Sequence, residues 1–273
     1  MRYKIGSLTY ELLDDICLAV QSSQAIIANL PNTHVESLGP FLELIQTQQS
    51  LLPSQGSKNW LSVEKYRALL NVKQQSKVWL DTGAGEQGFI SIPQLQDDAN
   101  SRTNLMLCVK RAAIKSGFSN DHAGQFSAAV NEMYSNAIEH SENAESGYVA
   151  FLSEPGKFEF VVADSGIGIL RSLKSNPLYA SLTNSGSALE MALKEGVSRH
   201  YVEKGHGFGF RQLLVGLANI SNYIRFRSGD YGRIIQRGKN GAIEGTTIQL
   251  SNIEGFFCSV VFEVAGKRSA HVS

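Results

Sequence analysis

The chain has 273 residues, which is enough for one large domain or two modest ones, each with its own core. Hydrophobic residues make up 42% and charged residues 18%, a globular composition that excludes wholesale disorder. The 25 basic and 25 acidic residues cancel, so the net charge implies no affinity for nucleic acid or for an anionic membrane.

The first third of the chain is expected to be mainly helical. Helices are predicted over residues 8–29, which Pro31 ends, and over residues 35–52 and 61–70, with a strand over residues 77–80. None of these segments carries a catalytic constellation. The region could sense, tether or dimerise, and the sequence does not choose among these roles.

The N-terminus and the cysteines indicate a cytosolic protein. Only Arg2 and Lys4 precede an interrupted stretch that contains acids, which is no secretory signal. No run of about eighteen uncharged apolar residues indicates a membrane span. Three cysteines stand far apart in apolar stretches without metal-ligand spacing, so we expect reduced core residues at Cys17, Cys108 and Cys258.

A glycine-rich hexapeptide, Gly83–Gly88, literally matches the dinucleotide fingerprint GxGxxG. It precedes a second strand, Phe89–Pro93, where the fingerprint requires a helix that faces the pyrophosphate. No acidic residue stands about twenty residues further on, as the fingerprint also requires. We therefore predict a hairpin turn.

From Leu95 the pattern changes to a mixture of helices and strands. Asp97 or Asp98 is expected to cap the first helix, which Gly117 ends, and Asn120 or Asp121 to cap the second. The predicted helices are 98–116, 120–140, 187–194 and 210–220, and the predicted strands are 147–153, 158–163, 223–227, 233–236, 246–250 and 256–264. Helices on one side of a mostly antiparallel sheet make an α+β sandwich.

The segment Phe126–His140 carries two stripes when it is read as a helix. Its apolar stripe consists of Phe126, Val130, Met133 and Ala137. Its neighbouring polar stripe consists of Glu132, Asn136 and His140, each one turn after the last. Such a row could position water, hold a hard cation through the amide and line the pocket of an anionic ligand. An ordinary amphipathic helix with a solvated polar edge is the alternative.

Three further motifs follow, and each also has an ordinary structural explanation. Asp164–Ile169 reads DxGxG after an apolar strand, where the acid could accept a hydrogen bond from an exocyclic amine or simply cap a tight turn. Gly205–Phe210 precedes a helix, so its N–H groups could converge on phosphate oxygens or form a lid hinge. Gly245–Thr247 begins a late strand, where a threonine hydroxyl could support the pocket near the acid, although β-branched residues often start strands.

In this order, the motifs ExxxNxxxH, DxGxG, GxGxG and Gly-Thr resemble the GHKL ATPases. That superfamily includes gyrase-type topoisomerases, MutL repair proteins, chaperone ATPases, histidine kinases and anti-sigma-factor serine kinases. The form Asn-Ala-Ile-Glu-His looks closest to the anti-sigma-factor kinases and to related stand-alone bacterial ATP-binding proteins. The resemblance covers about residues 88–250.

The resemblance implies an α+β fold of the Bergerat type, a sandwich of helices on a mixed, mostly antiparallel sheet. It divides the chain into a mainly helical region of unknown role, residues 1–86, an ATP-binding domain, residues 87–264, and a tail, residues 265–273. Residues 170–204 would form a mobile lid over the nucleotide.

The resemblance also implies roles for individual residues. Glu132 would be the general base or the carboxylate that orients water, and Asn136 would be the Mg²⁺ ligand. Asp164 would bind the adenine amine, with a threonine nearby through water, either Thr246 or Thr247. His140 matches the last position of its motif, although a helix-packing role fits it equally well.

The glycine-rich motifs have implied roles as well. Gly166 and Gly168 would make room for the base. Lys204 and Arg211 flank the phosphate loop and could neutralise charge, although solvated side chains are the default for both. The residues that would wrap the triphosphate are Gly205, His206, Gly207, Phe208 and Gly209.

Two functions from different classes follow from the resemblance. The first is a regulatory Mg·ATP-dependent ATPase or serine/threonine protein kinase of the anti-sigma-factor type, which hydrolyses ATP or transfers its γ-phosphoryl group to a protein partner. The second is a non-catalytic, ATP-gated protein-binding switch, and a carboxylate at position 132 favours the first. We expect a cytoplasmic protein that binds ATP, Mg²⁺ and a protein partner. We expect no membrane or nucleic-acid partner, and a homodimer is one possible oligomeric state.

Other relatives fit less well. The chain lacks the sequence GxxxxGK[ST], so a P-loop mechanism is excluded. A histidine kinase would need a phosphoacceptor histidine on a helical hairpin, which His34–Pro40 matches only in part. No transducer region is expected after Val264, which disfavours gyrase-like or MutL-like work on DNA. A degenerate fold that serves only as a scaffold is the plainest alternative.

Overall fold

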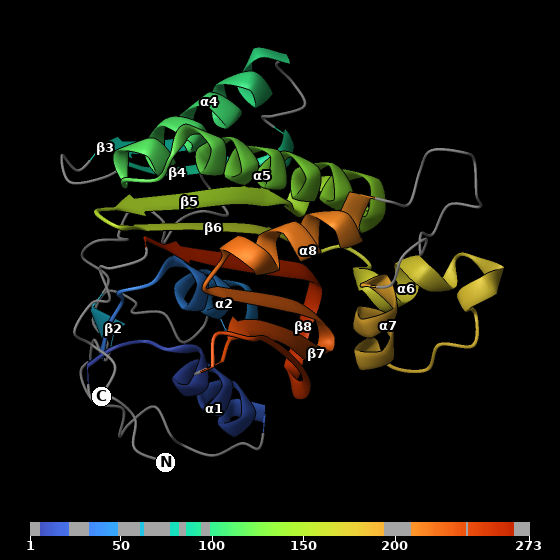
Figure 1. Ribbon diagram of the computed structural model, residues 1–273. Coiled ribbons are helices and arrows are strands. Elements are labelled where there is room, and N and C mark those ends of the chain that lie inside the picture. The colour runs from blue at the N-terminus through green and yellow to red at the C-terminus, as the bar shows by residue number, and fades with distance from the viewer. Residues whose placement is uncertain are drawn as a thin grey trace.

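The computed structural model describes residues 6–21, 33–48, 61–62, 77–81, 86–93, 99–193, 209–238 and 240–264. In this part of the chain, one sheet lies between two layers of helices (Figure 1). The helices are α1 (Tyr10–Gln21), α2 (Leu38–Gln48), α4 (Ala99–Lys115), α5 (Asn120–Ser141), α6 (Gly168–Lys174), α7 (Ser185–Ala192) and α8 (Gly209–Ile220), with short 3₁₀ turns η4 (Ala144–Ser146) and η5 (Pro177–Tyr179). The strands are β1 (Thr33–His34), β2 (Leu61–Ser62), β3 (Lys77–Asp81), β4 (Glu86–Ser91), β5 (Tyr148–Glu154), β6 (Lys157–Asp164), β7 (Tyr223–Arg237) and β8 (Ile243–Glu263).

The main sheet has six strands in the order β3-β4-β5-β6-β8-β7. Each neighbouring pair among these described strands is antiparallel, whereas the separate pair β1–β2 is parallel. Strands β3 and β4 pair as the predicted hairpin requires, with Asp81 at the end of β3 opposite Glu86 at the start of β4, whereas residues 82–85 lie outside the described part. Helices packed on a largely antiparallel sheet confirm the predicted α+β class.

Helices α4, α5 and α8 cover one face of the sheet, and the apolar stripe of α5 lies in the core beneath them. The ring of Phe126 on α5 stacks on that of Phe262 on β8, with 3.7 Å between centroids. The N-cap of α5 is Ser119, whose hydroxyl accepts the His122 N–H, so the cap lies one residue before the predicted Asn120. The predicted stripe is confirmed, since each of its members is at most 4% exposed: Phe126, Val130, Met133 and Ala137.

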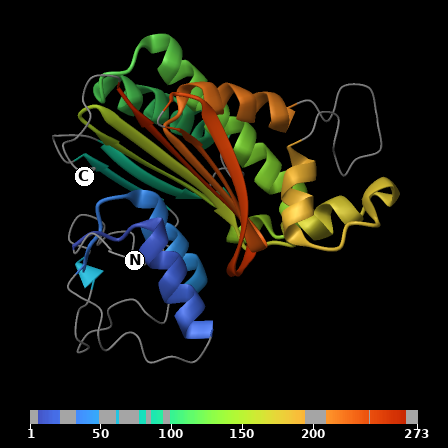
Figure 2. The ribbon, with the colours of Figure 1, turned by 60° about the horizontal axis from the view of Figure 1, so that its bottom comes forward.

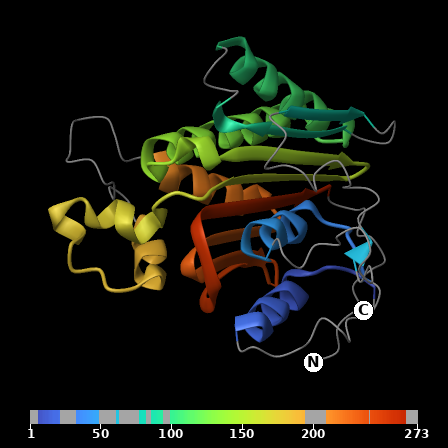
Figure 3. The same ribbon diagram turned by 180° about the vertical axis from the view of Figure 1, so that it is seen from behind.

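Helices α1 and α2 cover the opposite face of the same sheet (Figures 2 and 3). Their buried side chains form a second core with strands β4, β5, β6 and β8, and its largest members include Phe41, Phe89 and Phe257. Strand β3 is the edge of the sheet next to β4. The described part of the region before residue 87 thus shares a sheet and a core with the rest of the chain.

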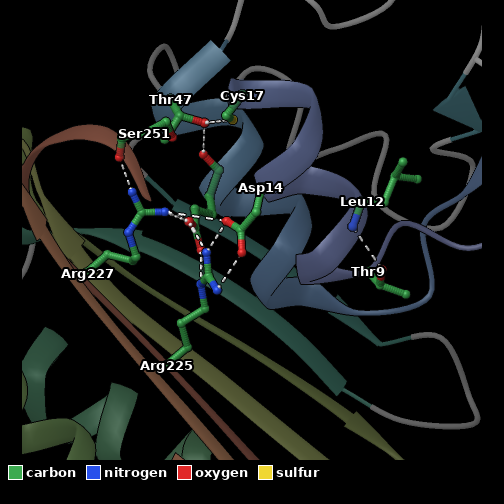
Figure 4. A network of polar contacts seen from close by, with 9 residues as sticks. Thr9, Leu12, Asp14, Cys17, Thr47, Arg225, Arg227 and Ser251 are labelled. Carbon is green, nitrogen blue, oxygen red and sulfur yellow. Dashed lines mark hydrogen bonds and ion pairs between the residues drawn. The ribbon is translucent and has the colours of Figure 1, made fainter. Parts of the chain in front are cut away.

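A buried ionic cluster joins this back layer to β7, and it consists of Asp14, Glu43, Arg225 and Arg227. Arg225 contacts both acids. Its Nη2 lies 2.5 Å from Asp14 Oδ1 (Figure 4), and its Nε lies 2.8 Å from Glu43 Oε2. Arg227 donates to Glu43 and to the carbonyl of Ser251. Because a buried charge without its partner is costly, the cluster specifies how α1 and α2 lie on the sheet.

The two acids of the cluster respond differently to burial. Burial alone would raise the pKa of Glu43, but the guanidinium groups of Arg225 and Arg227 outweigh it and lower that pKa. For Asp14, burial outweighs the attraction of Arg225 and raises the pKa. Glu43 is therefore the acid whose charge the cluster stabilises.

Two predictions of secondary structure are wrong in the described residues. Residues 61–62 form β2, which pairs with β1, in place of the start of a helix; residues 63–70 lie outside the described part. The four predicted strands after residue 222 form two long strands, β7 and β8, because the break in β7 is a local register shift around Gly229. The strands therefore continue through positions where the sequence pattern is interrupted.

The cysteines are largely as predicted. Cys17 and Cys258 are buried, Cys108 is half-buried, and all three are free thiols. No helix in the part of the chain that the structure describes is long and apolar enough to cross a membrane.

Candidate functional site

The polar stripe of α5 lies beside its core stripe, as the sequence predicts. Glu132, Asn136 and His140 are all half-buried. The Asn136 Nδ2 atom is buried, and no described residue accepts a hydrogen bond from it. A buried amide donor that lacks an acceptor is costly, so this position is suited to an added oxygen acceptor.

Helix α4 fixes the orientation of α5 next to this stripe. Arg102 on α4 donates from Nε to Asn131 Oδ1 at 2.8 Å and from Nη2 to Ser135 Oγ at 3.1 Å. These two acceptors directly precede Glu132 and Asn136 in the sequence. The polar stripe is thereby held from the side as well as from the core beneath it.

Asp164 ends β6 and is only 3% exposed. The Gly166 N–H donates to its Oδ1 at 2.8 Å, and the Phe256 N–H also donates to the carboxylate. Burial raises the pKa of Asp164 from 3.8 to about 6, and these backbone hydrogen bonds offset it only in part. No cation in the described residues compensates this charge. The carboxylate is thus a strong acceptor in a poorly solvated place.

The turn after Asp164 packs tightly against two other elements. A Cβ on Gly166 would lie 2.1 Å from the Ser141 carbonyl at the end of α5. Gly168 has φ +72°, and a Cβ there would lie 2.8 Å from Ser228 Oγ on β7. Glycine is therefore required by the protein's own packing at both positions, beside any room that they leave for a ligand.

The same turn is held by hydrogen bonds from its own backbone. The Ile167 N–H donates to the Ser141 carbonyl at 2.9 Å, and the Ser165 N–H donates to Ser146 Oγ at 2.8 Å. The Ile169 N–H donates to Ser228 Oγ at 2.9 Å. The end of α5, the turn and β7 thus form one connected structure beside Asp164.

Helix α8 begins at Gly209, the last glycine of the GxGxG motif and one residue before the predicted start at Phe210. It contacts α5, so its N-terminus belongs to the same face of the sheet as the polar stripe (Figure 1). A helix N-terminus offers free N–H groups and favourable potential to an anion. The rest of the predicted phosphate loop lies outside the described residues, and this holds for Gly205, His206, Gly207 and Phe208; the side chains of Lys204 and Arg211 are likewise outside.

The described part of the predicted lid consists of α6, η5 and α7. Asn176 caps η5 and Asn184 caps α7, because Asn176 Oδ1 accepts the Leu178 N–H and Asn184 Oδ1 accepts the Ser187 N–H. Helix α7 packs against β7, where a Cβ on Gly186 would meet the Tyr231 ring at 2.7 Å. Residues 168–193 are therefore docked on the β7–β8 hairpin in this structure.

The structure does not bring the predicted threonines to Asp164. Thr246 and Thr247 pair with Ile234 and Arg233 in the outer part of the β7–β8 hairpin. The Thr247 hydroxyl accepts a hydrogen bond from Arg233 Nη1 at 3.0 Å. The β8 residue that faces Asp164 in the register is Phe256, nine positions after Thr247.

The residue that closes this side of the site is Gly255, which the sequence analysis missed. It has φ +73°, and a Cβ there would lie 2.2 Å from the Asp164 carbonyl and 2.6 Å from the Gly166 nitrogen. Its signal in the sequence is a glycine directly before the last apolar strand. The sequence pattern instead favours Gly245, because a threonine pair follows it. In the structure Gly245 pairs with Ile235 in the outer part of the β7–β8 hairpin.

Comparison with known families supports this geometry. Residues 95–207 match the family model described as a histidine kinase-like ATPase domain. These residues are therefore similar to a histidine kinase-like ATPase domain. The match spans α4, α5, the Asp164 turn, α6 and α7, and it ends inside the GxGxG motif. No curated protein matches this chain.

The donor set of the matched residues fits ATP with Mg²⁺. The buried Asn136 amide lacks an acceptor, which a phosphate oxygen would supply, while its oxygen is a hard ligand of the kind that Mg²⁺ prefers. Asp164 offers a buried acceptor for an exocyclic amine. Among the described residues no cluster of three or more His, Cys, Asp or Glu could hold a metal ion.

Proposed function

We propose that this chain binds Mg·ATP between α5, the Asp164 turn and the N-terminus of α8. We further propose that it cleaves the bond between the β- and γ-phosphates of ATP. The observation that supports this most is the Asp164 carboxylate, which is 3% exposed and has a raised pKa. Burial of this hydrogen-bond acceptor destabilises the folded protein, and the amine of adenine would supply the missing donor.

Each residue of the α5 stripe has a role in this proposal. Asn136 would hold Mg²⁺ through its amide oxygen, and such an ion would supply charge compensation for the phosphates. Glu132 takes the proton of the attacking hydroxyl, either of water or of a partner's serine or threonine. The N–H groups that open α8 receive the phosphate oxygens.

The physiological acceptor of the phosphoryl group is proposed to be a protein. This rests on the Asn-Ala-Ile-Glu-His form of the α5 motif, which is similar to that of anti-sigma-factor serine kinases. A cytoplasmic, regulatory role and the second candidate, an ATP-gated binding switch, follow from the same likeness. The switch is favoured over catalysis only if Glu132 proves dispensable, since binding alone needs no carboxylate there.

Incubation with γ-labelled ATP and Mg²⁺ tests the catalytic proposal. Wild-type protein is expected to release labelled phosphate or to label a co-purified partner. Glu132→Ala should reduce this turnover at least a hundredfold while ATP binding persists, because a general base contributes about 10²–10⁴-fold. The control is Glu139→Ala, which removes an exposed carboxylate from the same helix and should keep turnover. Wild-type binding without turnover would instead establish the switch.

A further inference from the structure

One side chain of the back layer reaches the site from behind the sheet. Gln46, in the last turn of α2, donates from Nε2 to the Asp164 carbonyl at 2.9 Å and to the Glu254 carbonyl at 3.1 Å. Its Oε1 accepts the Tyr148 hydroxyl at 3.4 Å. A single amide therefore bonds the last residue of β6 and a residue of β8, and α2 lies outside the matched residues 95–207.

The two carbonyls belong to segments that approach each other closely at Gly255. Gly255 follows Glu254, and a Cβ on it would meet the Asp164 carbonyl at 2.2 Å and the Gly166 nitrogen at 2.6 Å. The Gly166 N–H is the donor to the Asp164 carboxylate. A shift of either carbonyl thus moves the backbone that aims Asp164.

Helix α2 gives Gln46 a fixed support. At its N-terminus the Leu38 N–H and the Ser37 hydroxyl both donate to Glu159 Oε2 on β6, each at 2.9 Å. In its middle, Glu43 is bonded to both arginines of the ionic cluster. The helix is therefore held to the sheet along its length, and the Gln46 amide is placed before any ligand arrives.

We propose that Gln46 is a positioning residue for base recognition. It holds the Asp164–Gly166 turn so that the carboxylate meets the exocyclic amine of adenine. Guanine carries a carbonyl oxygen at the corresponding ring position, which would face the carboxylate without a proton between them. The preference for adenine over guanine then depends on a helix outside the matched ATPase residues; this inference rests on the proposed function.

Gln46→Met tests this, because it keeps the length of the side chain and removes both donor bonds. Calorimetric Kd values for ATP, adenosine and GTP should be measured on the full chain with Mg²⁺. ATP and adenosine are each expected to weaken about tenfold, which corresponds to one or two lost hydrogen bonds, while GTP changes little. The matched control is Gln48→Met, in the same turn of α2, which should keep the wild-type ratio of ATP to GTP affinity.

A merely structural role for Gln46 predicts a different result. ATP and GTP would then weaken by the same factor, together with a lower thermal midpoint, and the ratio would stay as in wild type; that outcome overturns the inference. Should Gln46→Met fail to fold, Gln46→Asn shortens the reach to both carbonyls and must lower the same ratio. Wild-type protein that binds no ATP would defeat the proposed function itself, whereas unchanged selectivity in the variants defeats only the role of Gln46.

Discussion

At the scale of single residues, the negative charge of Asp164 is in a buried position where it destabilises the folded protein. It is 3% exposed, and burial raises its pKa from 3.8 to about 6. A neutral residue of the same shape would suit the folded protein better. Buried charged residues that lack a partner are candidates for functional residues, because a ligand can supply the missing partner.

Asp164→Asn should therefore stabilise the free protein at neutral pH. Because the folded pKa is raised, the contribution of Asp164 to stability is greatest below pH 3.8 and declines as pH rises through about 6. The variant is expected to gain about 3 kcal/mol in the free energy of unfolding at pH 8, and less at pH 5. Urea denaturation at both pH values measures this. A variant that is less stable than wild type at pH 8 would show that the carboxylate is already compensated.

One glycine of the Asp164 turn and one glycine of α5 should respond oppositely to alanine. A Cβ on Gly166 would lie 2.1 Å from the Ser141 carbonyl, so Gly166→Ala must displace the end of α5 or the turn and should cost at least about 2 kcal/mol. Gly124 lies within α5 with open space around its Cβ position, so Gly124→Ala should add about 0.5–1 kcal/mol. Thermal unfolding of both variants checks the contrast, and equal shifts would contradict it.

At the scale of elements, the buried ionic cluster decides how α1 and α2 lie on the sheet. Arg225 and Arg227 are at most 1% exposed, so both need the acids that the back layer supplies. The cluster stabilises the arrangement only while its charges are matched. Its disruption should therefore be felt in the stability of the whole sheet.

Glu43→Gln is expected to lower the free energy of unfolding by about 3 kcal/mol, because two buried guanidinium groups lose their shared carboxylate. The folded pKa of Glu43 is lowered, so its contribution is present above pH 4.5 and is lost as pH falls below that value. Wild type and variant should therefore converge in acid. Asp15→Asn, next to Asp14 on α1, serves as a control with little expected effect, and a similar loss in both variants would refute the role of the cluster.

At the scale of the whole molecule, the residues that match the histidine kinase-like ATPase domain are one part of a three-layer structure. The front layer carries the α5 stripe and the start of α8, and the back layer carries α1 and α2. Hydrogen bonds from α2 reach the last residue of β6, Asp164, and Glu254 within β8. The back layer is thus placed to affect the site without lying in it.

Much of the fold and of the site could be predicted from local sequence patterns. The helical spacing of residues in α5 predicts both its apolar and its polar stripe. The strand after Gly83–Gly88 likewise predicts the pairing of β3 with β4. Both features depend on residues that are close together in the sequence. The register of β8 depends on distant pairing. The threonine assignment failed because the hairpin extension separates Thr246 and Thr247 from the strand residue opposite Asp164, Phe256. Gln46 could not be recognised, since its partners are 118 and 208 positions away.

Calorimetric titration with Mg·ATP tests the central claim most directly. Wild-type protein is expected to bind Mg·ATP, and Asp164→Asn to lose at least about tenfold in affinity, because an amide that keeps its oxygen on the Gly166 N–H presents a donor to the amine of adenine. The affinity of wild type should also fall as pH drops through about 6, where Asp164 becomes protonated. No heat of binding in wild type, or equal affinity in a folded Asp164→Asn variant, would contradict the account.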